Sequence, residues 1–231
     1  PFADSYFYLS PDISVMIEES LAIVENTGNT TLANKIKYVQ RQPSAVWMDS
    51  IGTITAEGSD GSRRTLEGHL DAAIEQQQFY AQQDGQIAPM TIVVIIYNLP
   101  DRDCAAFASN GKLYEVGKPN VNHSALNGMD VYRRDYIGKI VEIFNSKPEY
   151  QDLRIVAMLE PDSYPNMITN TELNPDGPSL IWPDLTTNDG TTYCDTLLND
   201  YSAPGLADGL GVYGHGLQIA INELAEVGNV Y

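Results

Sequence analysis

Two short apolar runs, each followed by charged residues, stand out in the hydrophobic pattern of the chain. Residues 91–97 are all β-branched or aromatic, and residues 154–160 form a second run. Such runs are typical of strands that are buried in a parallel sheet. Because parallel strands have their carboxyl ends at one edge of a sheet, we expect the polar residues after both runs to form the functional site.

Segments with helical periodicity lie before, between and after these two runs. The apolar spacing predicts helices at residues 12–25, 31–42, 66–83, 130–145 and 207–225. A third strand is predicted at residues 45–48, and residues 1–11 are expected to be an extended, aromatic-rich segment. This order predicts an α/β fold of parallel strands with helical crossovers. Three strands are too few to close a barrel.

Polar stretches at residues 58–63, 110–127 and 171–192 are predicted to be loops. The last of them carries Trp182 and is rich in proline, glycine, asparagine and aspartate. Structureless loops of this length are usually functional or disordered.

The composition favours one large folded domain with a neutral or cationic partner. The 231 residues are 43% hydrophobic and carry a formal net charge of -18. Because this charge repels phosphates and anionic lipid surfaces, neither nucleic acid nor a membrane is expected as a partner. Polysaccharides are neutral polymers and fit this charge.

The residues after the two apolar runs suggest acid–base chemistry. Asp101 and Asp103 follow the first run with Arg102 between them, and Asp162 follows the second. Neighbouring carboxylates drive their pKa values apart, which equips one of them to donate a proton. Polar turns that merely end two strands are the alternative interpretation.

No metal or cofactor site is expected. His69, His123 and His215 lie far apart and lack the spacing of zinc ligands. The chain also lacks a glycine-rich phosphate-binding motif.

Several motifs carry a resemblance that spans nearly the whole chain. They are YNLPDRDCAA at 97–106, ASNG at 108–111, LEPDS at 159–163, TN at 169–170 and PSAVWMD at 43–49, together with residues 1–11 and 212–231. Together they resemble glycoside hydrolase family 6, the family of cellobiohydrolase II and related β-1,4-endoglucanases. The resemblance implies a distorted β/α barrel with fewer than eight strands. Residues 1–231 are then the N-terminal portion of a single catalytic domain, roughly its first half, and residues 229–231 enter the next strand.

The resemblance also implies catalytic roles. Asp162 matches the general acid. Asp103 matches the neighbouring carboxylate, which helps to keep the Asp162 carboxyl protonated and to stabilise positive charge at the anomeric carbon. Tyr97 matches the tyrosine against the distorted sugar, and Ser109 matches the serine that helps hold the attacking water. Position 98 is Asn where many members have Asp, and it receives no role. The aspartate proposed as the base in this family lies on a later loop than this chain contains.

Three residues are expected to bind substrate. Trp47 matches an aromatic platform on which a glucose ring stacks, and Asp49 lies in the same matched segment. Trp182 is expected to be a further sugar contact. A place in the core is the alternative for Trp47, because tryptophan is highly buried on average.

The two cysteines, Cys104 and Cys194, are either free thiols or a disulfide, depending on the compartment. In the family the cysteine after the Asp-Arg-Asp motif is disulfide bonded. The resemblance therefore implies a Cys104–Cys194 bond and a secreted protein.

The expected activity is inverting hydrolysis of the β-1,4-glucosidic bonds of cellulose, without a cofactor. This reaction needs a protonated acid at the leaving oxygen and a water on the opposite face of the sugar. The loop at 171–192 could roof the cleft into a tunnel, which favours a cellobiohydrolase. An endoglucanase of the same family and a non-catalytic glucan-binding fragment are the alternatives. A carbohydrate-binding module elsewhere in the full-length protein is left open.

Overall fold

β3 (Met90–Ile96) is the strand with which the other three strands of the sheet pair. All of these pairings are parallel. Six of the seven β3 residues are buried, as expected for an uninterrupted apolar run that is covered on both faces. The predicted α/β fold with parallel strands is confirmed. The computed structural model of the protein describes residues 2–56, 63–103, 111–115, 127–163 and 211–231.

The register aligns the carboxyl ends of three strands. β4 (Leu153–Leu159) pairs with β3 along its whole length. β1 (Tyr6–Phe7) pairs with the first two residues of β3, and β2 (Val46–Met48) pairs with its last three. Because β4 occupies one edge of β3, β1 and β2 follow one another along the other edge. β2, β3 and β4 therefore end side by side.

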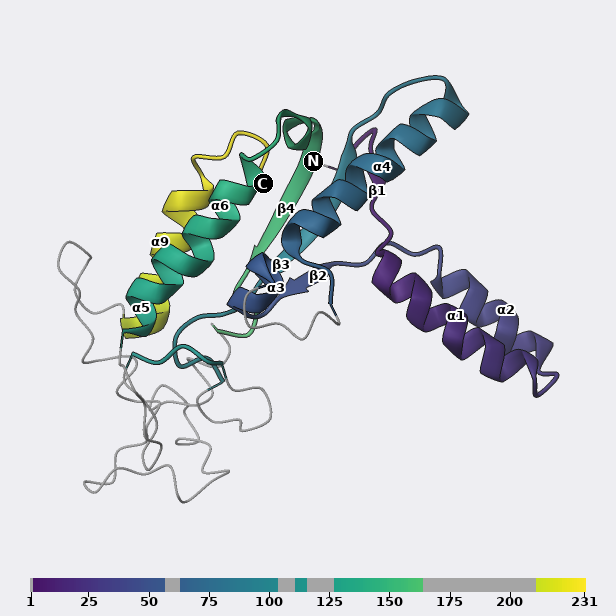
Figure 1. The fold of residues 1–231 in the computed structure, drawn as a ribbon, viewed down its shortest axis with the longest axis horizontal. Coiled ribbons are helices and arrows are strands. Elements are labelled where there is room, and N and C mark those ends of the chain that lie inside the picture. Colours follow the sequence, from purple (N-terminus) through teal and green to yellow (C-terminus); the bar gives the residue numbers. More distant parts are fainter. Residues whose placement is uncertain (1, 57–62, 104–110, 116–126, 164–210) are drawn as a thin grey trace, which may run out of the picture.

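Helices make the crossovers that parallel pairing requires. α4 (Leu66–Asp84) connects β2 to β3 and packs against β3. Thr65 caps its start by accepting a hydrogen bond from the Gly68 N–H, and Gly85 ends it in the left-handed conformation. α9 (Gly211–Leu224) follows β4 in sequence. In Figure 1, α9 lies beside α6, and α4 lies on the other side of β4.

The connection between β3 and β4 contains an irregular helix. α5 (Gly128–Val131) continues into a π-helical segment (Tyr132–Ile137) and then into α6 (Gly138–Phe144). A 3₁₀ turn (Pro148–Asp152) leads from there into β4. π-Helical turns are rare and are frequently found at functional sites.

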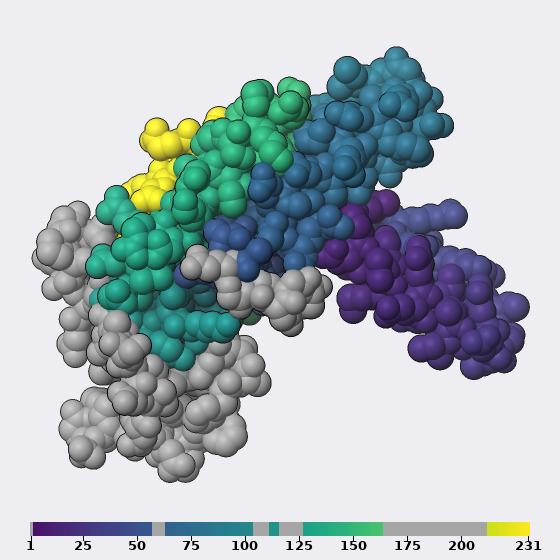
Figure 2. Space-filling view, in the orientation of Figure 1, coloured from purple at the N-terminus to yellow at the C-terminus, as the bar shows by residue number. Residues whose placement is uncertain are grey.

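α1 (Pro11–Glu25) and α2 (Thr30–Val39) pack against each other and project from the rest of the molecule (Figures 1 and 2). Pro11 occupies the first turn of α1, where its missing N–H has no cost. The Asn29 side chain caps α2 by accepting from the Leu32 N–H.

Sequence patterns missed several short elements, among them β1, α3 and the 3₁₀ turn before β4. β1 lies inside the segment expected only to be extended, and its two residues are too few to show periodicity. α3 (Ile51–Thr55) directly follows the site segment after β2 and is a single turn, stabilised by a capping box at Ser50. The helix predicted at 31–42 ends earlier, at Val39.

The end of the chain lies alongside β4. Val230 forms a parallel bridge with Ile155, and the Tyr231 N–H donates to the Ile155 carbonyl at 2.9 Å. This agrees with the expectation that residues 229–231 enter a further strand. The described strands form an open sheet, with β1 and β2 at one edge and this bridge at the other. Within the described ranges, no helix has the length and apolar character needed to cross a membrane.

Candidate active site

The carboxyl ends of β2, β3 and β4 bring three polar segments to one edge of the sheet. Met48 and Leu159 both lie opposite Ile96 in the parallel register. Asp49 follows β2, residues 97–103 follow β3, and residues 160–163 follow β4. The predicted convergence of acidic loops at this edge is therefore present.

Tyr97, Arg102 and Asp103 form a cluster that is largely shielded from solvent. The Tyr97 hydroxyl donates to Asp103 Oδ1 at 2.7 Å, and Arg102 Nη1 donates to Asp103 Oδ2 at 3.0 Å. The guanidinium lies over the Tyr97 ring, 4.4 Å from its centroid. Burial, and then the hydrogen bond to Asp103, raise the pKa of Tyr97, so its phenol stays a neutral donor. Charge-assisted contacts to both oxygens fix the orientation of the Asp103 carboxylate.

The backbone of these loops adopts uncommon conformations. Asp101 and Asp103 each have a φ of 54°, and Glu160 has a φ of 42°. The left-handed region costs a residue other than glycine roughly 1–2 kcal/mol. Such conformations persist only where surrounding contacts enforce them, and they cluster at functional sites.

Asp101 supplies contacts that hold the β3 loop. Its N–H donates to the Leu113 carbonyl, and its Oδ2 accepts from the Glu115 N–H, both at 2.8 Å. Its carbonyl accepts from the Tyr213 hydroxyl of α9 at 2.9 Å. Asp101 is 1% exposed, so it serves the conformation of the loop, and Asp103 is the acid that joins the aromatic cluster.

Trp47 and Asp49 extend the site along β2. Trp47 is 41% exposed, which excludes a place in the core, and its ring meets Tyr97 edge to face at 5.6 Å. Arg63 Nη1 donates to both Asp49 oxygens at 3.0 Å, and its Nη2 donates to the Trp47 carbonyl at 3.1 Å. Arg63 therefore fixes the Asp49 carboxylate beside an accessible indole.

Glu160 is a buried carboxyl between the β3 and β4 segments. Its Oε1 accepts from the Asn98 N–H at 2.9 Å and from the Tyr132 hydroxyl at 3.1 Å. Burial raises the pKa of Glu160 to about 8, although these hydrogen bonds and the charge of Arg102 oppose the shift. The side chain is therefore neutral over most of the acidic and neutral pH range.

The π-helical segment holds three strand ends through two fully buried tyrosines. The Tyr136 hydroxyl donates to the Met48 carbonyl and accepts from the Tyr97 N–H at 3.0 Å. Tyr132 reaches the end of β4 through its bond to Glu160. The extra residue in the π turn thus places both hydroxyls at the carboxyl edge of the sheet.

Asp162 is the exposed acid of the site. It lies in a turn in which the Ser163 N–H donates to the Glu160 carbonyl at 3.0 Å. In the part of the chain that the structure describes, its side chain forms no hydrogen bond or ion pair. The sheet brings Asp162 to the same edge as Asp103, and neither is hydrogen bonded to the other. Four other predicted residues lie outside the described ranges: Ser109, Trp182, Cys104 and Cys194.

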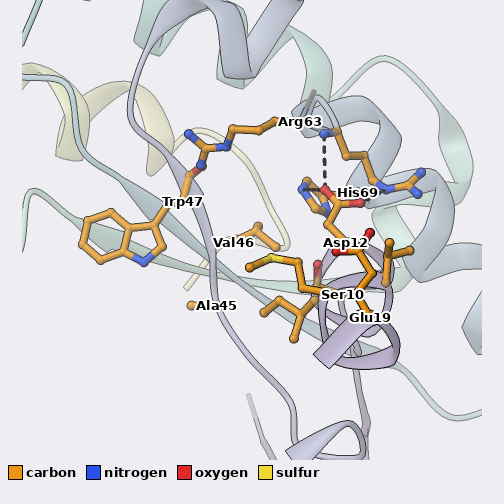
Figure 3. Close-up of a pocket in the computed structure, with 12 residues that line it drawn as sticks. Ser10, Asp12, Glu19, Ala45, Val46, Trp47, Arg63 and His69 are labelled. Carbon is orange, nitrogen blue, oxygen red and sulfur yellow. Dashed lines mark hydrogen bonds and ion pairs between the residues drawn. The ribbon is translucent and has the colours of Figure 1, made fainter. Parts of the chain in front are cut away.

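A pocket of about 500 Å³ opens beside Trp47, between α1, β2 and the start of α4 (Figure 3). His69 lies in its wall and is hydrogen bonded through Nδ1 to the Tyr8 hydroxyl at 2.8 Å. Burial lowers the pKa of His69 to about 4, so the ring is neutral above that pH. The formal charges of the remaining lining residues balance, since two are acidic and two are basic: Asp12, Glu19, Arg63 and Arg64. Among the described residues, no group of three or more potential ligands is placed to hold a metal ion.

Sequence reasoning gave no role to Arg102, Glu160, Tyr132 or Tyr136. The position of Glu160 directly after a buried apolar strand is the sequence feature that could have indicated a role for this residue. The two tyrosines are four positions apart, which predicted only a helix face. Their convergence on the strand ends depends on the π turn, and no sequence pattern announces such a turn.

Comparisons with known proteins agree with this geometry. The family model described as glycosyl hydrolases family 6 matches residues 2–176. The chain belongs to this family. Over 170 residues it is 36% identical to Exoglucanase A of Cellulomonas fimi, covering 74% of this chain and 17% of that protein. Over 172 residues it is 27% identical to Endoglucanase-6B of Humicola insolens, covering 74% of this chain and 41% of that protein.

A solved structure extends the likeness to the whole chain. The catalytic domain of Cellulomonas fimi Cel6B has a TM-score of 0.70 and 30% identity, covering 100% of this chain and 41% of that domain. The chain thus spans less than half the length of each of these glycosyl hydrolase family 6 relatives.

Proposed function

We propose that the protein carrying this chain is an inverting glycoside hydrolase that cleaves the β-1,4-glucosidic bonds of cellulose. The observation that carries the proposal is the pair of acids at two neighbouring strand ends. Asp162 is exposed and can reach a leaving oxygen, whereas Asp103 is buried and held in one orientation. Two carboxyls in such different environments suit the two different tasks of this reaction.

In this proposal Asp162 donates its proton to the glycosidic oxygen as the bond from that oxygen to the anomeric carbon breaks. A water, held in part by Ser109, adds to the anomeric carbon from the opposite face. The fixed negative charge of Asp103 stabilises the positive charge that develops there. Tyr97 lies against the reacting sugar, and no residue of this chain is assigned as the base that accepts the proton of the water.

Substrate binding is assigned to the exposed face of Trp47, with Asp49 beside it and Trp182 as a further contact. An indole offers an apolar surface to the face of a glucose ring. A neutral glucan also suits a chain with a net charge of -18, and it suits the balanced charges of the pocket next to Trp47.

We assign exo action, as a cellobiohydrolase that releases cellobiose. This is supported by 36% identity to a relative named as an exoglucanase and by the predicted loop at 171–192. Endo action is the second candidate, because a relative named as an endoglucanase also matches.

The proposal extends to the whole protein. Residues 1–231 form the N-terminal portion of one catalytic domain, and the open sheet closes into a distorted barrel through further strands. Cys104 and Cys194 form a disulfide, and the protein is secreted. Catalysis needs no cofactor, and cellulose and cello-oligosaccharides are the partners.

Asp162→Asn tests the acid, with Asp152→Asn as the matched control because Asp152 is an exposed acid before the opposite end of β4. We expect the first change to lower kcat on cellohexaose by about 10²–10⁴-fold, and the second to leave it unchanged. Cellobiose as the main product from cellulose supports exo action, whereas rapid loss of carboxymethylcellulose viscosity supports endo action. Binding of cellohexaose without turnover by the wild-type protein would instead identify a non-catalytic glucan-binding protein.

A further inference from the structure

The Glu160 side chain connects the two loops that carry the proposed catalytic acids. Through Oε1 it accepts from the Asn98 N–H, next to Tyr97, at 2.9 Å. The same oxygen accepts from the Tyr132 hydroxyl at 3.1 Å, which attaches it to the π-helical segment. Glu160 is 2% exposed, so water does not compete for these bonds, and they are stronger than equivalent bonds at the surface.

The backbone of Glu160 determines where Asp162 lies. Its N–H donates to the Ile96 carbonyl at 2.8 Å, which extends the β3–β4 ladder by one bond. Its carbonyl then accepts from the Ser163 N–H and closes the turn around Asp162. The turn begins with Glu160 at a φ of 42°, and a non-glycine residue keeps such a conformation only when neighbouring contacts enforce it.

We propose that Glu160 is a positioning residue that fixes Asp162 relative to the Tyr97–Asp103 pair. The proposal rests on the function proposed above, in which Asp162 is the general acid. Glu160 does not touch substrate, and it acts through the Asn98 N–H on one side and the turn of residues 160–163 on the other. A displacement of about 1 Å in a catalytic group can cost roughly 10²-fold in rate.

The neutral form of Glu160 fits its surroundings. Within the described residues, its buried Oε2 has no hydrogen-bond partner, and an ionised carboxylate with such an oxygen carries a large desolvation cost. The groups that face it include the backbone N–H groups of Asn98 and Leu99, the Tyr132 and Tyr136 hydroxyls, and the more distant positive charge of Arg102. Glutamine has the same shape and keeps the accepting oxygen, so Glu160→Gln is expected to preserve the positioning.

Two substrates that differ in their need for an acid test this role. Cellotetraose has a sugar alcohol as leaving group and requires protonation, whereas 2,4-dinitrophenyl β-cellotrioside releases a stable phenolate and does not. We expect Glu160→Ala to lower kcat on cellotetraose by about 100-fold and on the aryl substrate by less than about 5-fold, with KM changed less than about threefold. Glu160→Gln restores most of the loss. Glu149→Gln, at an exposed glutamate, changes neither rate.

Tyr132→Phe removes one donor to Oε1 and is expected to shift the ratio of the two rates in the same direction by a smaller factor. If Glu160→Ala does not fold, the ratio of the two rates measured for Tyr132→Phe tests the positioning role in its place. Equal losses on both substrates in Glu160→Ala and Tyr132→Phe would overturn the positioning role and leave the proposed activity intact. A wild-type protein that cleaves neither substrate would overturn the proposed activity and this inference with it.

Discussion

Single residues at the site divide between those placed to meet the substrate and those that hold them. Trp47 and Asp162 are exposed, whereas Asp103 has each carboxylate oxygen held by a charge-assisted or phenolic hydrogen bond. Glu160 and Tyr132 lie behind them as a buried hydrogen-bonded pair. A catalytic arrangement must be held within fractions of an ångström, and locked supporting side chains provide that precision.

Protonation of Glu160 makes a specific contribution to stability. Its folded pKa of about 8 lies above the ordinary value of 4.5, so this contribution is fully present below pH 4.5 and is lost as the pH rises toward 8. Relative to Glu160→Gln, the wild-type free energy of unfolding should fall by roughly 1.4 kcal/mol per pH unit between about pH 5 and 8. Urea unfolding of both proteins at several pH values measures this difference. Parallel stability curves would contradict a protonated Glu160.

At the scale of elements, close packing of α9 against the loop after β3 supports the site. Gly216 lies against Leu99, and a Cβ built at this position would fall 2.0 Å from Leu99 Cδ2. Tyr213, one turn earlier on α9, donates to the Asp101 carbonyl of the same loop. The helix therefore holds the loop that carries Asp103 through one polar and one apolar contact.

Gly216→Ala should lower the free energy of unfolding by roughly 1–3 kcal/mol through overpacking, although alanine has the higher helix propensity. Gly228→Ala is the matched control, because a Cβ there meets nothing within 4 Å. Combining Gly216→Ala with Leu99→Ala should cost less than the sum of the two single changes, since truncating Leu99 removes the clash. Thermal or chemical unfolding measures all four proteins, and strict additivity would contradict the proposed contact.

Sequence patterns predicted the strands that are buried on both faces and the long helices that bury one continuous face. A strand covered on both faces, such as β3, appears as an uninterrupted apolar run, and α4 appears as a long periodic helix with Thr65 and Gly85 at its ends. Motifs also indicated Asp103 and Asp162. The two-residue β1, the single turn of α3 and the π turn under the site leave no such pattern, because tertiary contacts determine them.

At the scale of the molecule, the described part of the chain is an open parallel sheet with helical crossovers and a projecting α1–α2 hairpin (Figure 1). The chain covers 41% of the Cellulomonas fimi Cel6B catalytic domain with a TM-score of 0.70. The ends of β2, β3 and β4 already bring Asp49, the Tyr97–Arg102–Asp103 cluster and Asp162 to one edge of the sheet. The full activity is a property that we propose for the whole protein.

The net charge of -18 predicts a stability that depends on salt. Self-repulsion destabilises a compact chain, and raising the ionic strength from about 0.01 M to 0.15 M shortens the screening length from about 30 Å to 8 Å. The unfolding temperature should therefore rise by a few degrees over this range, equally for sodium and potassium chloride. An unfolding temperature that stays constant or falls would show that local ion pairs outweigh the net repulsion.

The central claim is that Asp162 donates a proton in an inverting cleavage of β-1,4-glucan. Proton NMR of cellohexaose incubated with the purified protein follows the anomer that forms first. The account predicts that the α-anomer appears before mutarotation and that Asp162→Ala abolishes its formation. Initial release of the β-anomer, or undiminished turnover by Asp162→Ala, would contradict it.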